Sequence, residues 1–127
     1  MDNQIKHEEW FFQSDYDLET AQQMLQTERM VYCIFMCHLS LEKALKGLFI
    51  KRLNQFPPKI HSLMYFVSKI QLALSEENLL FIEKIDNLSI PIRYPEDLRA
   101  MIALYTSLQT TSIYEQTKTI QQWLKQQ

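Results

Sequence analysis

Three short clusters hold the side chains whose types and spacing could do chemistry in this sequence. They are Glu42-Lys43 with Lys46, His61 with Ser62, and Arg93-Tyr94-Pro95. Lysine and arginine bind phosphate groups, and a guanidinium can do so through two parallel hydrogen bonds. Histidine gains and loses a proton near neutral pH, and a tyrosine ring can stack on a base. Each cluster is a weak signal by itself, but together they contain the residue types of a site for a phosphate-bearing ligand.

The same residues have structural alternatives. Glu42 lies in an apolar stripe and needs a partner, because an unpaired buried carboxylate is costly. Lys46, one helical turn later, and Arg93 are both candidates for a packing ion pair. His61 can satisfy a helix end, Tyr94 can shape a rigid turn with the following proline, and exposed lysines are common on helices. On sequence alone both interpretations stay open.

Helices are the elements that must position these clusters, because helical periodicity covers most of the chain and strand alternation is nearly absent. Helices are expected over residues 5–27 and 29–53, after Ser62, after Ser75, and from Pro95 to the end. Pro91 and Pro95 bracket a break, and weak helix formers at 110–112 suggest an interruption. We predict one all-α domain over residues 1–127, an up-and-down bundle of four or five helices.

The second of these helices carries a stripe of small residues on one face: Cys33, Cys37, Ser40, Ala44 and Gly47. Another helix can approach closely there, either within the chain or across a dimer. We expect the two cysteines to pack as inert thiols rather than to act in redox chemistry.

Composition excludes several classes of protein. A single glycine among 127 residues argues against glycine-rich phosphate loops, and a net charge of −2 argues against a surface that binds nucleic acid throughout. Two cysteines one helical turn apart are too few ligands for zinc, so we expect neither metal nor cofactor. With no signal peptide or apolar run long enough to cross a bilayer, a cytoplasmic protein without membrane contact is expected.

In their order and spacing, the three clusters resemble the HEPN family of helical domains. The resemblance covers nearly the whole chain. It is carried by Trp10, Asp17-Leu18, Ala21, Tyr32, Phe35, Glu42-Lys43-Ala44, Pro58, His61-Ser62-Leu63, Arg93-Tyr94-Pro95, Ile120 and Trp123. The sequence departs from the family pattern at His38 and Leu39, where glutamines are frequent, and at Ser62, where aspartate is common.

The resemblance implies a homodimer that binds a nucleotide and is paired with a small nucleotidyltransferase, often as a toxin–antitoxin system. Many members are metal-independent RNases with an arginine followed by histidine after four to six residues. No arginine of this chain has a histidine in that window. The leading hypothesis is therefore a nucleotide- or phosphate-binding module that uses Glu42, Lys43, Lys46, His61, Arg93 and Tyr94. The alternatives are a divergent RNase using Arg93, His61 or Glu42, and a protein-interaction module without a ligand.

Overall fold

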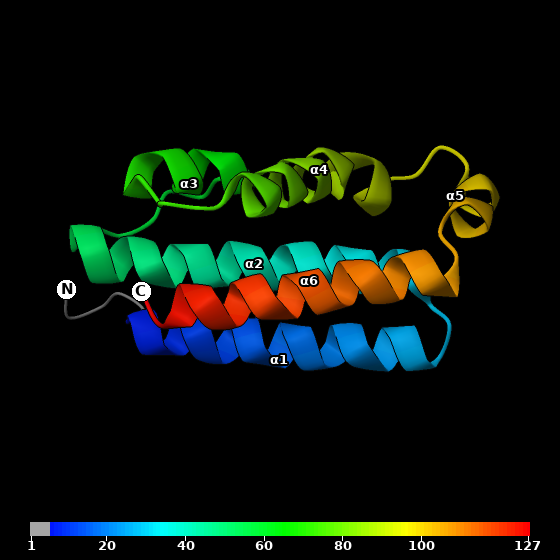
Figure 1. Cartoon of the computed structure of the whole chain (residues 1–127), viewed down its shortest axis with the longest axis horizontal. Helices are drawn as coiled ribbons and strands as arrows, with labels where there is room; N and C mark the ends of the chain where they lie inside the picture. Colours follow the sequence, from blue (N-terminus) through cyan, green and yellow to red (C-terminus); the bar gives the residue numbers. More distant parts are fainter. Residues whose placement is uncertain (1–5) are drawn as a thin grey trace.

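The computed structural model describes residues 6–127, and within them the chain forms six α-helices and no strand (Figure 1). The helices are α1 (His7–Gln26), α2 (Met30–Leu53), α3 (Leu63–Ile70), α4 (Glu76–Arg93), α5 (Leu98–Leu104) and α6 (Ser107–Lys125). The all-α prediction is confirmed, and the described part has six helices where four or five were expected. Ile5, the predicted start of the first helix, lies outside the described residues.

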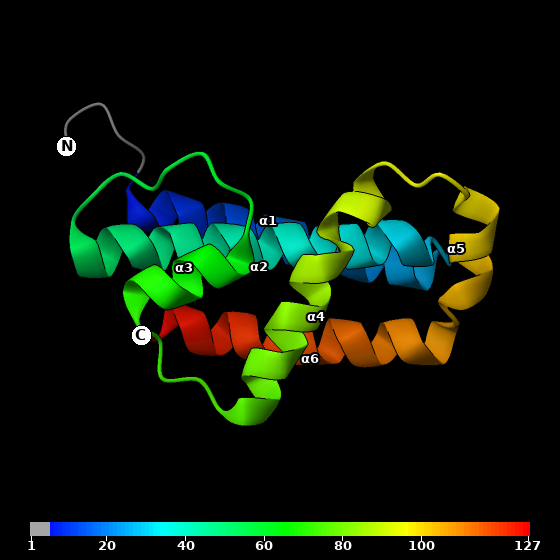
Figure 2. The same ribbon diagram turned by 90° about the horizontal axis from the view of Figure 1, so that it is seen from above.

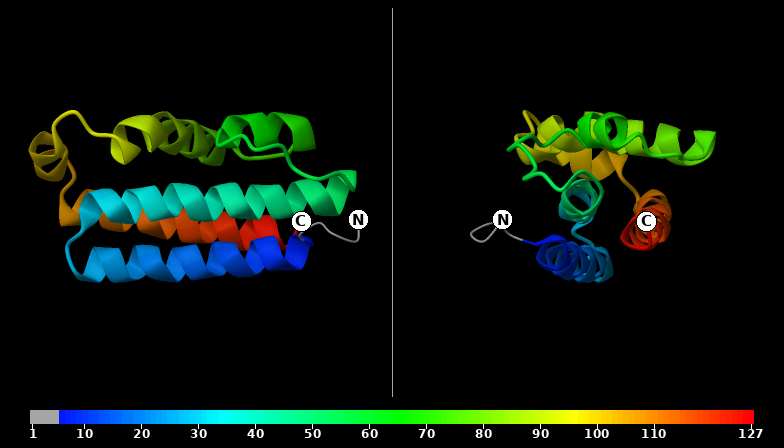
Figure 3. Two further views of the ribbon diagram at one scale, coloured as in Figure 1. Left: turned by 180° about the vertical axis from the view of Figure 1, so that it is seen from behind. Right: turned by 90° about the vertical axis from the view of Figure 1, so that its left-hand side faces the viewer.

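Three long helices form the base of the fold, and two shorter ones cover it. α1 and α2 are an antiparallel pair, α6 lies beside both, and α3 and α4 lie across α2 (Figures 1 and 3). α4 crosses the layer obliquely, and α5 returns the chain to the end where α2 begins (Figure 2). α6 runs parallel to α2 and antiparallel to α1 (Figure 1).

Most helix starts follow local signals in the sequence. Ser62 caps α3 by accepting a hydrogen bond from the Tyr65 amide (3.2 Å), and Ser75 caps α4 in the same way from Asn78 (3.1 Å). Both caps were predicted, because a serine oxygen satisfies an amide that has no partner within the helix.

The boundaries around the prolines differ from the prediction. α4 continues through Pro91 to Arg93, and α5 begins after Asp97, whose carboxylate accepts from the Ala100 amide (3.0 Å), rather than at Pro95. Residues 110–112 lie inside α6, so the interruption expected there is wrong. The break falls instead at 105–106, where Thr106 forms a capping box with the residue three positions later.

The small-residue stripe of α2 packs against α1 of the same chain. The Ser40 hydroxyl donates to the Ser14 carbonyl (2.8 Å), and Ser14 Oγ donates to the Ser40 carbonyl (2.7 Å). A Cβ placed on Gly47 would lie 2.7 Å from two ring carbons of Phe11. The sequence left open whether this stripe contacts a helix of the same chain or one of a dimer partner. In the structure it contacts α1 of the same chain. Cys33 and Cys37 are buried and not in a disulfide.

We predict that Gly47→Leu lowers the free energy of unfolding by about 1–3 kcal/mol, because a large side chain must displace the Phe11 ring and the Trp10 side chain of α1. Urea unfolding followed by circular dichroism measures the change. Lys51→Leu is the matched control, since Lys51 is exposed on the same helix. Equal stability of the two variants would show that α1 does not approach α2 at Gly47.

Among residues 6–127, no helix is long and apolar enough to cross a membrane.

Candidate functional site

The carboxylate of Glu42 is the centre of the polar cluster, and it is almost completely buried in the middle of α2. Lys46 Nζ and His61 Nδ1 both lie 3.0 Å from its Oε2 atom. Arg93 Nη2 lies 3.8 Å from the other oxygen, Oε1. Residues from α2, from the loop before α3 and from the end of α4 therefore converge on one carboxylate.

Lys46 is the most deeply buried cation of this cluster. Its side chain is only 8% exposed, and its ammonium lies 5.6 Å from the centre of the Trp10 ring and 5.8 Å from that of Phe66. A buried ammonium needs a counter-charge, which Glu42 supplies from one turn away in α2. Lys46 is therefore a fixed positive charge behind the cluster, while His61 and Arg93 lie nearer the surface.

Asp86 of α4 positions His61, because it holds the start of α3. Its carboxylate accepts hydrogen bonds from the Leu63 amide (2.9 Å), the Met64 amide (3.2 Å) and the Ser62 hydroxyl (3.1 Å). His38 Nε2 donates to the same carboxylate at 3.1 Å, from α2 below. This arrangement fixes the loop that carries His61 directly before the helix.

The environment of Asp86 keeps it ionised. Burial raises the pKa of its carboxyl, but the hydrogen bonds from His38 and from the two backbone amides together lower the pKa by more than burial raises it. The pKa of Asp86 therefore lies below its ordinary value. Sequence reasoning missed Asp86, because nothing in the spacing of α4 distinguishes it from the exposed acids of the same helix. His38 was noted only as a departure from a family pattern.

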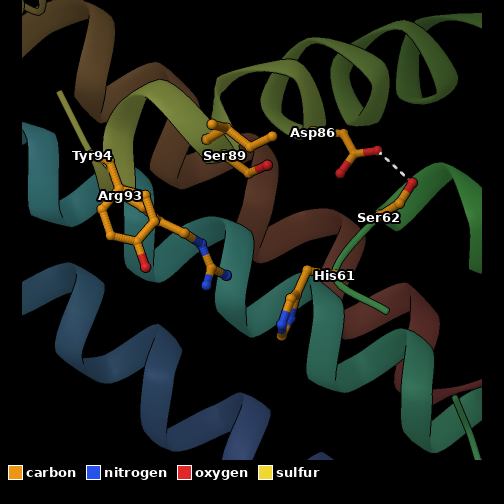
Figure 4. A pocket seen from close by; sticks show the side chains of 7 residues that line it. His61, Ser62, Asp86, Ser89, Arg93 and Tyr94 are labelled. Atoms are coloured by element: carbon orange, nitrogen blue, oxygen red, sulfur yellow. Dashed lines mark hydrogen bonds between the residues drawn. The ribbon is translucent and has the colours of Figure 1, made fainter. Parts of the chain in front are cut away.

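A cavity of about 480 Å³ opens beside the cluster, between the loop before α3 and the last two turns of α4 (Figure 4). It is lined by His61, Ser62, Asp86, Ser89, Ile90, Arg93 and Tyr94. In Figure 4 the guanidinium of Arg93 points across the cavity toward the His61 ring. The His61 side chain is 63% exposed, and Tyr94 is 80% exposed at the end of α4.

Two polar atoms of the cluster are buried without a hydrogen bond: Glu42 Oε1 and Arg93 Nη2. Their separation of 3.8 Å is longer than a hydrogen bond, so the guanidinium is attracted to the carboxylate but not fixed to it. The guanidinium can therefore turn without breaking a hydrogen bond to Glu42.

Lys43 is the one predicted site residue that lies apart from this group. Its ammonium pairs with the Asp17 carboxylate of α1 at 2.9 Å. Burial raises the pKa of Asp17, although the hydrogen bond from Lys43 opposes the rise. Glu42, Lys46, His61, Arg93 and Tyr94 are therefore brought together, while Lys43 stabilises the contact between α1 and α2.

The arrangement suits an anion better than a metal. Each carboxylate of the cluster faces cations or hydrogen-bond donors of the protein, and across residues 6–127 no group of three or more His, Cys, Asp or Glu side chains is placed to hold a metal ion. The cavity lining includes a guanidinium, an imidazole, a phenol and two serine hydroxyls, all of which can donate hydrogen bonds to phosphate oxygens. The Asp86 carboxylate also lines the cavity, and its oxygens accept hydrogen bonds from the Ser62 hydroxyl and two backbone amides.

Comparisons with known proteins agree with this fold. The sequence model of the HEPN domain matches residues 7–127. The crystal structure of TT1696 from Thermus thermophilus superposes with a TM-score of 0.79 at 21% identity, covering 94% of this chain and 96% of that one. The crystal structure of ST0689, described as an archaeal HEPN homologue, gives a TM-score of 0.74 at 24% identity, covering 95% and 96%. A search of the curated proteins found no significant match.

Proposed function

Because this chain belongs to the HEPN domain family, we propose that it binds the phosphate group of a nucleotide in the cavity between the loop before α3 and the end of α4. His61 and Arg93 provide the donors, and Tyr94 borders the site. Glu42 contacts both donors from the buried side of the site, and Lys46 pairs with Glu42. Lys43, paired with Asp17, stays a sequence prediction without a part in this proposal.

One observation carries the proposal. His61 and Arg93 come from distant parts of the sequence, yet they approach the two oxygens of one buried carboxylate and line one cavity. A purely structural ion pair would be satisfied by Lys46 alone, which already lies 3.0 Å from Glu42. The additional cation, loosely held at 3.8 Å, can turn to an incoming phosphate and form charge-assisted hydrogen bonds.

Assembly is part of the proposal. We propose a homodimer acting beside a small nucleotidyltransferase, as the resemblance to HEPN systems implies. The end of the molecule that carries α5 supports a protein contact, because large apolar side chains are exposed there. They are Leu98, Ile102 and Leu104 of α5 and Leu108 at the start of α6. Exposed apolar side chains gathered at one end are typical of protein-interaction surfaces.

A second candidate function, metal-independent cleavage of RNA, is favoured by the contact between His61 and Glu42. The carboxylate accepts from Nδ1, which orients the ring and leaves Nε2 as the nitrogen for proton transfer. His61 would take the proton of a ribose 2′-hydroxyl while the 2′-oxygen bonds to phosphorus and the bond to the 5′-oxygen breaks. The departing 5′-oxygen would take a proton from water, and Arg93 would stabilise charge on the phosphate. The residues come from separate elements rather than from the arginine–histidine motif of the family's RNases.

Isothermal titration with AMP tests the binding proposal. We expect Arg93→Gln to weaken AMP binding about tenfold to a hundredfold, since hydrogen bonds to charged groups contribute roughly 1.5–3 kcal/mol. Arg52→Gln, which removes an exposed arginine at the end of α2, is the matched control and should bind as the unchanged protein does.

Absence of AMP binding, or equal loss in both variants, would contradict a phosphate site at Arg93. A parallel incubation with short RNA in EDTA separates the second candidate. Cleavage that disappears in His61→Asn would favour the nuclease over a binding module.

A further inference from the structure

We propose that the ligand's base occupies a second hollow beside the phosphate cavity, formed by Tyr32, Phe35 and Tyr94; this inference rests on the proposed function. The hollow has a volume of about 210 Å³ and is lined by Tyr32, Phe35, Ile92, Arg93 and Tyr94. We call it the aromatic hollow. Its volume is several times the roughly 30 Å³ that one water molecule occupies in the liquid, so it can accept a flat ring system.

The aromatic hollow and the phosphate cavity share two residues. Arg93 and Tyr94 line both, so the two spaces are neighbours separated by these side chains. A ligand with its phosphate in the cavity and its ring in the aromatic hollow would lie beside the Arg93 side chain. Nucleotides have this form, with a charged group and a planar base joined by a sugar.

Three aromatic rings surround the hollow from two elements. Tyr32 and Phe35 lie three residues apart in α2 and therefore share a face, and Tyr94 follows the last residue of α4. Tyr32 is 50% exposed and Tyr94 is 80% exposed, while Phe35 is half-buried against the core. The exposed rings are available for stacking on a base without a change in the fold.

Arg93 connects the two parts of the site. Its guanidinium carbon lies 5.0 Å from the centre of the Phe35 ring, and Nη2 of the same group lies 3.8 Å from Glu42. The cation–π contact holds the guanidinium at the border of the aromatic hollow. A phosphate bound by Arg93 would thus place the attached sugar and base near the three rings.

The lining also indicates how the base is recognised. It contains no carboxylate or amide side chain that could read the hydrogen-bonding edge of a base, and the proposal assigns its one guanidinium, that of Arg93, to the phosphate. Recognition by stacking tolerates every base, because each has a π-face. We therefore expect the hollow to accept AMP and GMP with similar affinity, and to add affinity over a ligand that has only sugar and phosphate.

Paired titrations with AMP and ribose 5-phosphate test the inference. We expect AMP to bind about tenfold more tightly, because stacking on aromatic side chains contributes on this scale. Tyr32→Leu should remove most of this difference, and Tyr32→Phe, which keeps a ring, should retain it. Tyr16→Leu, at a residue 64% exposed on α1, is the control for loss of a surface tyrosine. Thermal unfolding of each variant confirms that it is folded.

The outcomes separate this inference from the proposed function. Equal affinity for AMP and ribose 5-phosphate would overturn the aromatic hollow while leaving the phosphate site intact. An AMP preference that survives in Tyr32→Leu would also overturn it, since the base would then bind elsewhere. Binding of neither ligand would contradict the proposed function itself.

Discussion

Replacing Glu42 by alanine is expected to lower the free energy of unfolding by about 3–5 kcal/mol, the range for breaking a buried ion pair from one side. The physical reason is the ammonium of Lys46, which is almost fully buried between two aromatic rings and loses the carboxylate that neutralises it. His61 and Arg93 lose the same partner but are more exposed to water. Urea unfolding of the variant measures the loss.

The double variant Glu42→Met with Lys46→Met is the matched control. Replacing both members of a buried pair by apolar side chains of similar volume is often neutral for stability. We expect the double variant to recover most of the stability that Glu42→Ala loses. A stability of Glu42→Ala within about 0.5 kcal/mol of the unchanged protein, the usual range for surface substitutions, would contradict burial of the pair.

The second large effect is expected for Asp86. Asp86→Ala removes the acceptor of two backbone amides, the Ser62 hydroxyl and His38. We expect a loss of about 2–4 kcal/mol, because a helix cap contributes roughly 0.5–2 kcal/mol and a hydrogen bond to a charged group about 1.5–3 kcal/mol. Thermal or urea unfolding checks the value. Asp97→Ala, which removes the exposed cap of α5, is the comparison and should cost clearly less.

Lowering the pH should also remove the stability that the Asp86 carboxylate contributes. The pKa of Asp86 is lower in the folded chain than its ordinary value, so the unfolded chain takes up this proton first as the pH falls. The stability that Asp86 contributes is complete above about pH 5 and is lost as the pH falls through its folded pKa. In Asp86→Asn the decline in stability between pH 6 and pH 3 should be smaller. Parallel profiles for the two proteins would contradict the assignment.

Much of the fold could be predicted from local signals. The apolar stripe of α2, the serines that begin α3 and α4, and the need of Glu42 for a partner all follow from periodicity and burial. Both partners weighed for Glu42 contact it, Lys46 closely and Arg93 at longer range, and His61 joins them. The choice between packing and ligand chemistry depends on the cavity that His61 and Arg93 line, which periodicity does not describe.

Other features of the fold and of the site could not be predicted, because they depend on contacts between elements that are distant in the sequence. Asp86 acts on α3 only because α4 folds back over the start of that helix, and no spacing along the chain encodes this. Tyr32 and Phe35 were identified as part of a family pattern, but their hollow requires Tyr94 from the end of α4. Weak helix formers at 110–112 were overridden because Thr110 and Ile113 are buried against the bundle.

A titration of ¹⁵N-labelled protein with AMP, followed by nuclear magnetic resonance, tests the central claim most directly. The account predicts that the largest shift changes fall on His61, Arg93 and Tyr94, and on Tyr32 across the aromatic hollow. Residues of α1 around Tyr16 should not respond. Shift changes centred on α1, or none at AMP concentrations that saturate weak sites, would contradict a nucleotide site between α3 and α4.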